Sequence, residues 1–302
     1  MENGQISTGS SATDWYRGQA PFLLRANSTT ELAAVAYGPN FVAGPGDNGD
    51  AKAFAASYTL ANTDSTINAS GEEQAAPSAS TLYHVYYCAS NAGDPPVANT
   101  LRLSTSAPMS YFGQYVLENS TSFGQQSPFL GLVLTNGSTE FEDSESFRGV
   151  LSYYVRRQKA IRLRPGYVDD NAQTNLAALN NAAYARINGG TGDTATYLTF
   201  GEEDVHFSAT WCTNAAIAAV CFVGIGDNSN TQPSGGAVFG VAAIAKTCVS
   251  AHAIAKPTTM ESRTVTMLAN TSSVPVTFVS DSGRGGAAAD VPQTYLVGML
   301  RG

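Results

Sequence analysis

Three acidic residues stand together in one short segment, Glu202, Glu203 and Asp204, directly after Gly201. A glycosidase places two carboxyl groups on either side of a glycosidic bond, one as acid and one as base or nucleophile. Contiguous acids in a turn cannot all face one cleft, so a solvated turn between strands is the interpretation that we favour. A glycan-cleaving site remains as the enzymatic alternative.

Two other groups carry atoms that bind metal ions. Residues 227–230 (Asp-Asn-Ser-Asn) offer oxygen atoms to Ca²⁺, but they lack the glycine and acid spacing of an EF-hand loop and are more typical of a turn. The four cysteines lie in apolar segments without C-x-x-C spacing, at Cys88, Cys212, Cys221 and Cys248. A zinc site would require His84 and His206 to join them. We therefore expect buried free thiols in a reducing compartment, and no metal or other cofactor.

Basic residues are concentrated between residues 148 and 164. Six of the sixteen lysines and arginines lie there: Arg148, Arg156, Arg157, Lys159, Arg162 and Arg164. Because side chains alternate along a strand, Arg156, Arg162 and Arg164 should share one face, and Arg157 and Lys159 the other. Nucleic-acid binding is one interpretation. We favour pairing between subunits with the acids of residues 140–145, because arginine binds carboxylates through two parallel hydrogen bonds.

Aromatic residues stand out in two polar segments. Trp15 and Tyr16 follow a Ser- and Thr-rich lead, as expected of an arm that docks onto a partner or onto the body of the protein. The second segment is a spacer rich in Gly, Ser and Gln that carries Tyr111, Phe112, Tyr115 and Phe123. Exposed aromatic side chains on loops bind glycans or proteins, whereas core packing is the ordinary alternative. These four residues are candidates for binding a receptor or a partner.

Composition narrows the class of protein. Only 13% of the residues are charged, which suits surfaces buried against neighbouring subunits, and the net charge is −8. An acidic chain repels phosphate backbones and anionic membranes, so we expect no nucleic-acid partner and no membrane insertion. The sequence contains no Ser-His-Asp elbow, phosphate loop, dinucleotide fingerprint or H-E-x-x-H motif. We therefore expect that the protein is not an enzyme.

The elements that would position these residues are mostly strands. Apolar and β-branched segments alternate with Gly, Pro, Asn and Asp clusters in residues 81–165, where Asn136-Gly137 is a strong hairpin signal. Seven further strand-like segments follow Thr194. Residues 166–192 carry helical spacing that ends at Gly189-Gly190. The patterns predict a mainly β protein of antiparallel, jelly-roll-like β-sandwich modules with one connecting helix.

The same patterns predict four parts along the chain. Residues 1–75 would be an N-terminal anchoring and assembly region, because a Gly-, Glu- and Ala-rich linker ends near residue 75. Residues 76–165 would form a β module, 166–192 a helical connector, and 193–302 a C-terminal β-sandwich.

The 76–165 module contains an ordered series of tyrosine-rich, L-x-L-S-T-x-A-P, T-N-G and S-Y-Y-x-R-R segments. This series resembles a module of bacteriophage tail-fibre and related virion proteins, over about 85 residues. The matching residues are Tyr83, Tyr86, Tyr87, Leu101, Leu103, Ser104, Thr105, Ala107, Pro108, Leu130, Gly131, Val133, Thr135, Asn136, Gly137, Phe141, Asp143, Ser144, Ser152, Tyr153, Tyr154, Arg156 and Arg157.

The resemblance implies a structural protein of the virion, assembled in the host cytoplasm as a homotrimer. We expect a tail-fibre or receptor-binding component that contacts other virion proteins and a host surface glycan or protein. Arg148, Arg156, Arg157, Arg162 and Arg164, with Trp15 and Tyr16, are the candidate interface residues. A capsid decoration, cement or head-fibre protein and a glycan-degrading tailspike are the alternatives.

Overall fold

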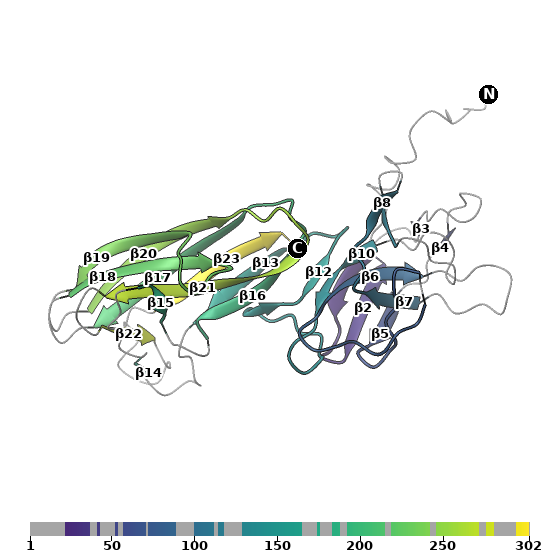
Figure 1. The fold of residues 1–302 in the computed structure, drawn as a ribbon, viewed down its shortest axis with the longest axis horizontal. Helices are drawn as coiled ribbons and strands as arrows, with labels where there is room; N and C mark the ends of the chain where they lie inside the picture. The colour runs from purple at the N-terminus through teal and green to yellow at the C-terminus, as the bar shows by residue number, and fades with distance from the viewer. Residues whose placement is uncertain are drawn as a thin grey trace, which may run out of the picture. The chain divides into compact units, whose positions relative to one another are not determined.

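A computed structural model shows a chain built from β-strands (Figure 1). It describes residues 22–36, 41–42, 52–53, 57–70, 72–88, 100–111, 114–117, 129–164, 174–175, 183–187, 192–214, 219–241, 246–271, 276–280 and 294–301. Every regular element in these ranges is a strand, which confirms the mainly β fold. Within the same ranges, no helix is long and apolar enough to cross a membrane.

The chain forms two compact units. Unit 1 comprises Met1–Asp143, Gly149–Arg156 and Gly302, and unit 2 comprises Ser144–Arg148 and Arg157–Arg301. The basic segment therefore contributes residues to both units. The division into four parts that the sequence suggests stays a prediction.

Unit 1 contains two antiparallel sheets with a shared core. The first has the order β1 (Phe22–Ala26), β2 (Glu31–Ala36), β5 (Ser57–Ala61). The second has the order β12 (Val150–Ser152), β10 (Phe129–Leu134), β6 (Leu82–Cys88), β7 (Thr100–Ser104). Two short pairs are β3 (Phe41–Val42) with β4 (Lys52–Ala53), and β8 (Met109–Tyr111) with β9 (Gln114–Val116). Leu24, Leu32 and Leu60 of the first sheet pack in one core with Val85, Leu103 and Val133 of the second.

Strand β6 shows why this part of the sequence alternates. Tyr83, Val85 and Tyr87 enter the core shared by the two sheets. Tyr86, on the opposite face, is also fully buried and packs against Phe129 at a ring distance of 5.9 Å. Both faces of β6 are covered, as its apolar pattern predicts.

The predicted hairpin turn follows β10. Asn136 accepts hydrogen bonds from the backbone N–H groups of Ser138 and Glu140 through its side-chain oxygen, at 2.8 and 3.0 Å. Thr139 adopts a positive φ of 64°, and Thr135 pairs with Phe141 across the turn. The turn chemistry of Asn136-Gly137 thus reverses the chain as the sequence indicates.

Unit 2 is a β-sandwich of two sheets. One, the β21 sheet, has the order β11 (Phe147–Arg148), β16 (Thr194–Thr199), β21 (Glu261–Thr271), β18 (Ala219–Asp227), β19 (Gly235–Val241), and β15 (Ala185–Arg186) also pairs with β21. The other, the β17 sheet, has the order β13 (Gln158–Leu163), β23 (Tyr295–Arg301), β17 (Val205–Asn214), β22 (Thr277–Ser280), β14 (Thr174–Asn175), and β20 (Lys246–Ala255) also pairs with β17. Trp211 and Phe207 of the β17 sheet share one buried core with Tyr197 and Met267 of the β21 sheet.

The predicted connecting helix is absent from the described part of residues 166–192. Residues 174–175 and 185–186 form the short strands β14 and β15. Ile187 is buried in the core of unit 2 and donates its backbone N–H to the carbonyl oxygen of Met267, at 3.3 Å. Tertiary packing of Ile187 therefore overrides the helical spacing here, and the remaining residues of the segment lie outside the described ranges.

A turn lies against part of the outer side of the β21 sheet. A Cβ atom on Gly226 would lie 2.1 Å from the carbonyl oxygen of Ser229, and one on Gly224 would lie 2.4 Å from the Cβ of Pro233. The outward positions 224 and 226 of β18 are glycines because Pro233 and the backbone of Ser229 come too close for a side chain there. Leu268, on the neighbouring strand, is fully buried on this side.

His84 is a buried titratable residue of β6. Its side chain is 6% exposed, packs against Phe129 at a ring distance of 5.9 Å, and leaves Nδ1 without a hydrogen-bond partner. Burial lowers the pKa of His84 from the ordinary 6.5, and a hydrogen bond with the Ser104 backbone opposes this shift only in part. His84 is therefore held neutral in the folded protein.

We predict that acid destabilises unit 1 through His84. Its pKa is lower folded than unfolded, so the unfolded chain binds the proton more readily, and stability falls as pH drops below about 6.5. The measurement is the thermal unfolding midpoint of wild type and His84→Gln at about pH 7.5 and about pH 5. The wild-type midpoint should fall further than that of the variant; equal falls would exclude this role for His84.

Candidate functional site

The acidic turn connects β16 to β17. Gly201 has a φ of 76° and donates its N–H to Oγ1 of Thr199 at 3.0 Å, which reverses the chain. Glu202 and Asp204 are exposed and Glu203 is half-buried. Asp204 lies 3.8 Å from Nζ of Lys256, with both side chains largely in solvent. These acids occupy a solvated turn, as the sequence indicates.

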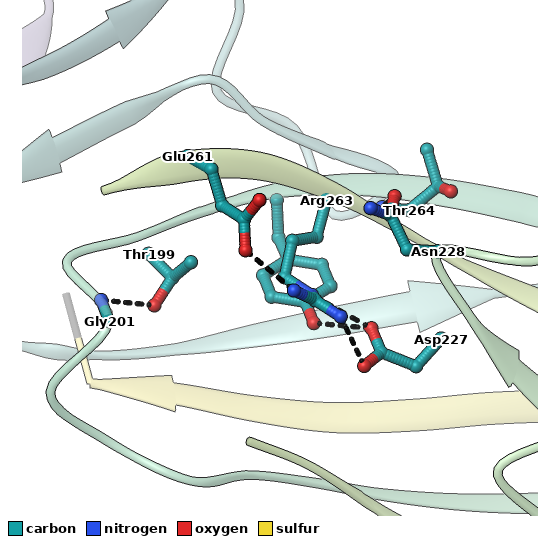
Figure 2. Close-up of polar contacts among 8 residues, drawn as sticks. Thr199, Gly201, Asp227, Asn228, Glu261, Arg263 and Thr264 are labelled. Carbon is teal, nitrogen blue, oxygen red and sulfur yellow. Dashed lines mark hydrogen bonds and ion pairs between the residues drawn. The ribbon is translucent and has the colours of Figure 1, made fainter. Parts of the chain in front are cut away.

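A polar cluster of unit 2 surrounds Arg263 (Figure 2). Its Nε and Nη2 donate to the two carboxylate oxygens of Asp227, at 3.1 and 2.7 Å, and Nη1 donates to Glu261 at 2.5 Å. The hydroxyl of Tyr197 donates to Oδ1 of Asp227 at 3.0 Å. Strands β16, β21 and β18 each contribute to this cluster, so one carboxylate links three neighbouring strands.

The electrostatics of this cluster suit a clamp rather than an acid or a base. Burial, and then the negative charge of Asp227, raise the pKa of Tyr197 far above its ordinary range. Hydrogen bonding to Asp227 raises the pKa of Arg263 as well. Both oxygens of Asp227 are engaged by donors. Tyr197 and Arg263 therefore keep their protons near neutral pH, as suits residues that hold strands together.

The neighbouring residues 228–230 form the predicted turn. The side-chain oxygen of Asn228 accepts the backbone N–H of Thr264 at 3.4 Å, and Asn230 accepts the hydroxyl of Thr266 at 3.2 Å. These two side-chain oxygens therefore accept hydrogen bonds from residues of β21. Across the part of the chain that the structure describes, no three His, Cys, Asp or Glu residues are grouped so as to hold a metal ion.

A second ion pair, between Arg186 and Asp193, lies directly before β16. Asp193 is fully buried, and its Oδ1 accepts hydrogen bonds from Nε and Nη2 of Arg186 at 3.1 and 2.5 Å. The backbone oxygen of Asp193 accepts the N–H of Met267 at 2.9 Å. Neither this pair nor the Arg263 cluster is predicted above. In the sequence, both contacts are indicated only by single charged residues inside or beside strand-like segments. Such a residue needs a partner of opposite charge if it is buried.

The candidate arginines have different environments. Nε of Arg148 donates to the carbonyl oxygen of Ala160 at 2.7 Å. Nη1 of Arg162 lies 3.2 Å from Oε1 of Glu145. This acid was expected to pair with an arginine of another subunit, and it pairs here within the same chain. Arg162 and Arg164 are exposed on the side of β13 opposite to buried Ile161 and Leu163, as alternation predicts.

The two arginines before β13 behave differently. Arg156 belongs to unit 1, where its guanidinium lies 5.2 Å from the ring centre of Tyr153 and donates to the Tyr153 carbonyl oxygen. It therefore precedes the strand and does not share the alternation of Arg162 and Arg164, contrary to expectation. Arg157 is exposed and belongs to unit 2.

Most aromatic candidates lie outside the described ranges: Trp15, Tyr16, Phe112 and Phe123. Tyr111 belongs to β8 and Tyr115 to β9, and the two strands pair antiparallel. Their role in binding a receptor or partner stays a prediction.

Two of the four cysteines form a disulfide. Cys212 of β17 and Cys248 of β20 are directly opposite in the ladder, with Cα atoms 4.1 Å apart. The expectation of free thiols is therefore wrong for this pair, because strand pairing joins residues 36 positions apart in sequence. Cys221 is a buried free thiol, as expected, and burial raises its pKa to about 12. Its sulfur is therefore protonated and unreactive at neutral pH.

No protein-family model matches this chain, and no curated protein matches it in sequence. One solved structure that is similar to it is described as "Structure of infectious bursal disease virus Gx strain", at 11% identity and a TM-score of 0.27. The match covers 73% of this chain and 56% of the other, so this chain spans little more than half of that protein. At this identity and TM-score, the likeness carries no argument about fold or function.

We predict that Asp227→Asn lowers the free energy of unfolding of unit 2 by about 2 to 4 kcal/mol, because Arg263 would keep its charge in a mostly buried position without its main partner. The measurement is denaturant unfolding. The control is Glu145→Gln, which breaks a half-exposed ion pair with Arg162 and should cost less than about 1 kcal/mol. Equal costs for the two substitutions would contradict the clamp.

Proposed function

We propose that this chain is a non-enzymatic structural protein of a bacteriophage virion, and that it works as a homotrimer in a tail fibre or receptor-binding component. Its partners would be other virion proteins and a host surface glycan or protein. The mechanism would be binding by shape, in which rigid β units hold loops in fixed positions.

The observation that carries this proposal is where the residues of the fibre-like pattern lie. Many of them are buried in unit 1: Tyr83, Tyr86, Tyr87, Leu101, Leu103, Ser104, Leu130, Val133, Thr135, Phe141 and Ser152. The pattern therefore consists largely of packing residues of a β scaffold. A resemblance of this kind supports a shared structural module, rather than a shared reaction.

The polar groups of this buried set are used within the scaffold. The hydroxyl of Tyr86 donates to the carbonyl oxygen of Ser106 at 2.8 Å, and that of Tyr83 accepts the backbone N–H of Ser78 at 2.7 Å. The hydroxyl of Thr135 donates to the Ser78 carbonyl oxygen and accepts the N–H of Thr81. Each of these bonds ties a connecting segment to the sheet, which favours a rigid body with fixed loops.

Unit 2 supports a structural role in a similar way. Asp227 is engaged by Arg263 and Tyr197, and the two sheets of the unit enclose one core around Trp211. A glycan-degrading tailspike would need two carboxyl groups facing one sugar bond, whereas Glu202 and Asp204 point to solvent from a turn. We therefore keep the tailspike as an alternative behind both structural roles.

A capsid decoration or cement protein is the closer alternative, since it would use the same rigid units. It would bind capsomers instead of the host surface. The exposed apolar residues Ile254 and Met299 suit either role, because both require a docking surface.

Binding to host cells and to empty capsids separates these roles. We expect the purified chain to adsorb to host cells, with no saturable binding to empty capsids. Capsid saturation at a fixed stoichiometry, without adsorption to cells, would instead establish the decoration role. Release of reducing sugar ends from host polysaccharide would overturn the non-enzymatic proposal, and binding to neither cells nor capsids would contradict both structural roles.

A further inference from the structure

The outer face of the β17 sheet gathers side chains from four strands. In the ladder, His206 of β17 lies opposite Met299 of β23 and Ile254 of β20, so these three side chains form one row. The next rows contain Ser208 with Val297 and His252, and Thr210 with Tyr295 and Ser250. Arg162 of β13 lies opposite Val297 and extends the second row to the strand at the other edge. The sandwich core lies on the opposite side of these strands.

This face carries apolar side chains that remain in contact with solvent. Ile254 is 47% exposed, Met299 45% and Tyr295 37%, all of them large and all within three ladder rows. The turn of residues 229–233 lies against part of the outer side of the β21 sheet, where Leu268 is fully buried. Among the described residues, nothing comparable lies on Ile254, Met299 and Tyr295, so this side of the β17 sheet is an unpartnered sheet face.

Strands β13, β23, β17 and β20 contain no Asp or Glu, whereas the whole chain has a net charge of −8. Two acids lie beside the face: Glu145, 3.2 Å from Arg162, and Asp204, 3.8 Å from Lys256. The side chains of the face itself are therefore basic or uncharged. The basic residues of these strands include Arg162, and Arg164 follows β13 on the same side. The rest of the chain is therefore more acidic than the net charge indicates. A partner that complements this face is an acidic protein, and another copy of this chain has that charge.

The size of the face also fits a protein partner. Strands lie about 4.8 Å apart and advance about 3.3 Å per residue, so four strands of this length cover roughly 400 to 650 Å². A specific interface takes about 500 to 800 Å² from each partner. The face is therefore of the size that a modest subunit contact requires.

We infer that the outer face of the β17 sheet binds a second copy of this chain. The inference rests on the proposed homotrimeric virion protein and names the surface that would join its subunits. The contact is heterologous: the basic, apolar face of one copy packs against a different and acidic surface of the next. A closed ring of three requires two unlike patches of this kind, and two copies of the same basic face would repel each other.

The test places a carboxylate on this face. Met299→Glu and Ile254→Glu each put a charge among the exposed apolar side chains, and should weaken self-association by on the order of tenfold or more. The matched control is Val220→Glu, since Val220 is 44% exposed on β18 of the other sheet. Mass is measured by light scattering and by sedimentation over a range of concentrations. Circular dichroism and the unfolding midpoint confirm that each variant is folded.

The outcomes separate this inference from the proposed function. Smaller particles for both face variants, with wild-type mass for Val220→Glu, support the inference. If all three variants keep the wild-type oligomer, the surface is wrong and the trimer stands. A monomeric wild type overturns the inference, while cell and capsid binding still decide the virion role. Face variants that remain oligomers but lose binding to empty capsids would assign the face to another virion protein, and would also overturn the inference.

Discussion

The carboxylate of Asp227 fixes the register of three neighbouring strands in the β21 sheet. Arg263 of β21 binds both of its oxygens, and Tyr197 of β16 donates to one of them. A slip of one residue between strands would turn every side chain to the opposite face of the sheet. Val223 and Ile225, which β18 places in the core, would then face outward. The register that places these residues in the core is the one in which the polar contact of Asp227 forms.

The same alternation explains why the two sheets of the sandwich have unlike outer faces. In β18, glycines occupy the outward positions 224 and 226, and the following turn lies against them. In β17, β20 and β23, the outward positions carry Ser, Thr, His and exposed apolar side chains instead. The large apolar side chains on the outer face of the β17 sheet suit a subunit that packs against another molecule. They are the physical link between the fold and the proposed role in an assembly.

Local patterns predicted the parts of the structure that depend on local physics. The strands, the Asn136 turn and the outward position of Arg162 and Arg164 follow from alternation and turn chemistry. The contacts that were missed join residues far apart in sequence. Cys212 meets Cys248 only because β17 pairs with β20, and Asp227 meets Arg263 only because β18 pairs with β21. A single sequence does not specify strand order, so these partners could not be assigned from it.

Residue type was enough to nominate most of the candidate interface residues, but not to locate them on the fold. Side-chain alternation holds for the basic residues of β13 but not for Arg156, which precedes that strand.

We propose that the chain is a component of the virion, and immunogold electron microscopy of purified phage particles is the measurement that tests this role. We expect label at one defined position on every particle. Particles without label, from lysates in which the protein is abundant, would contradict it.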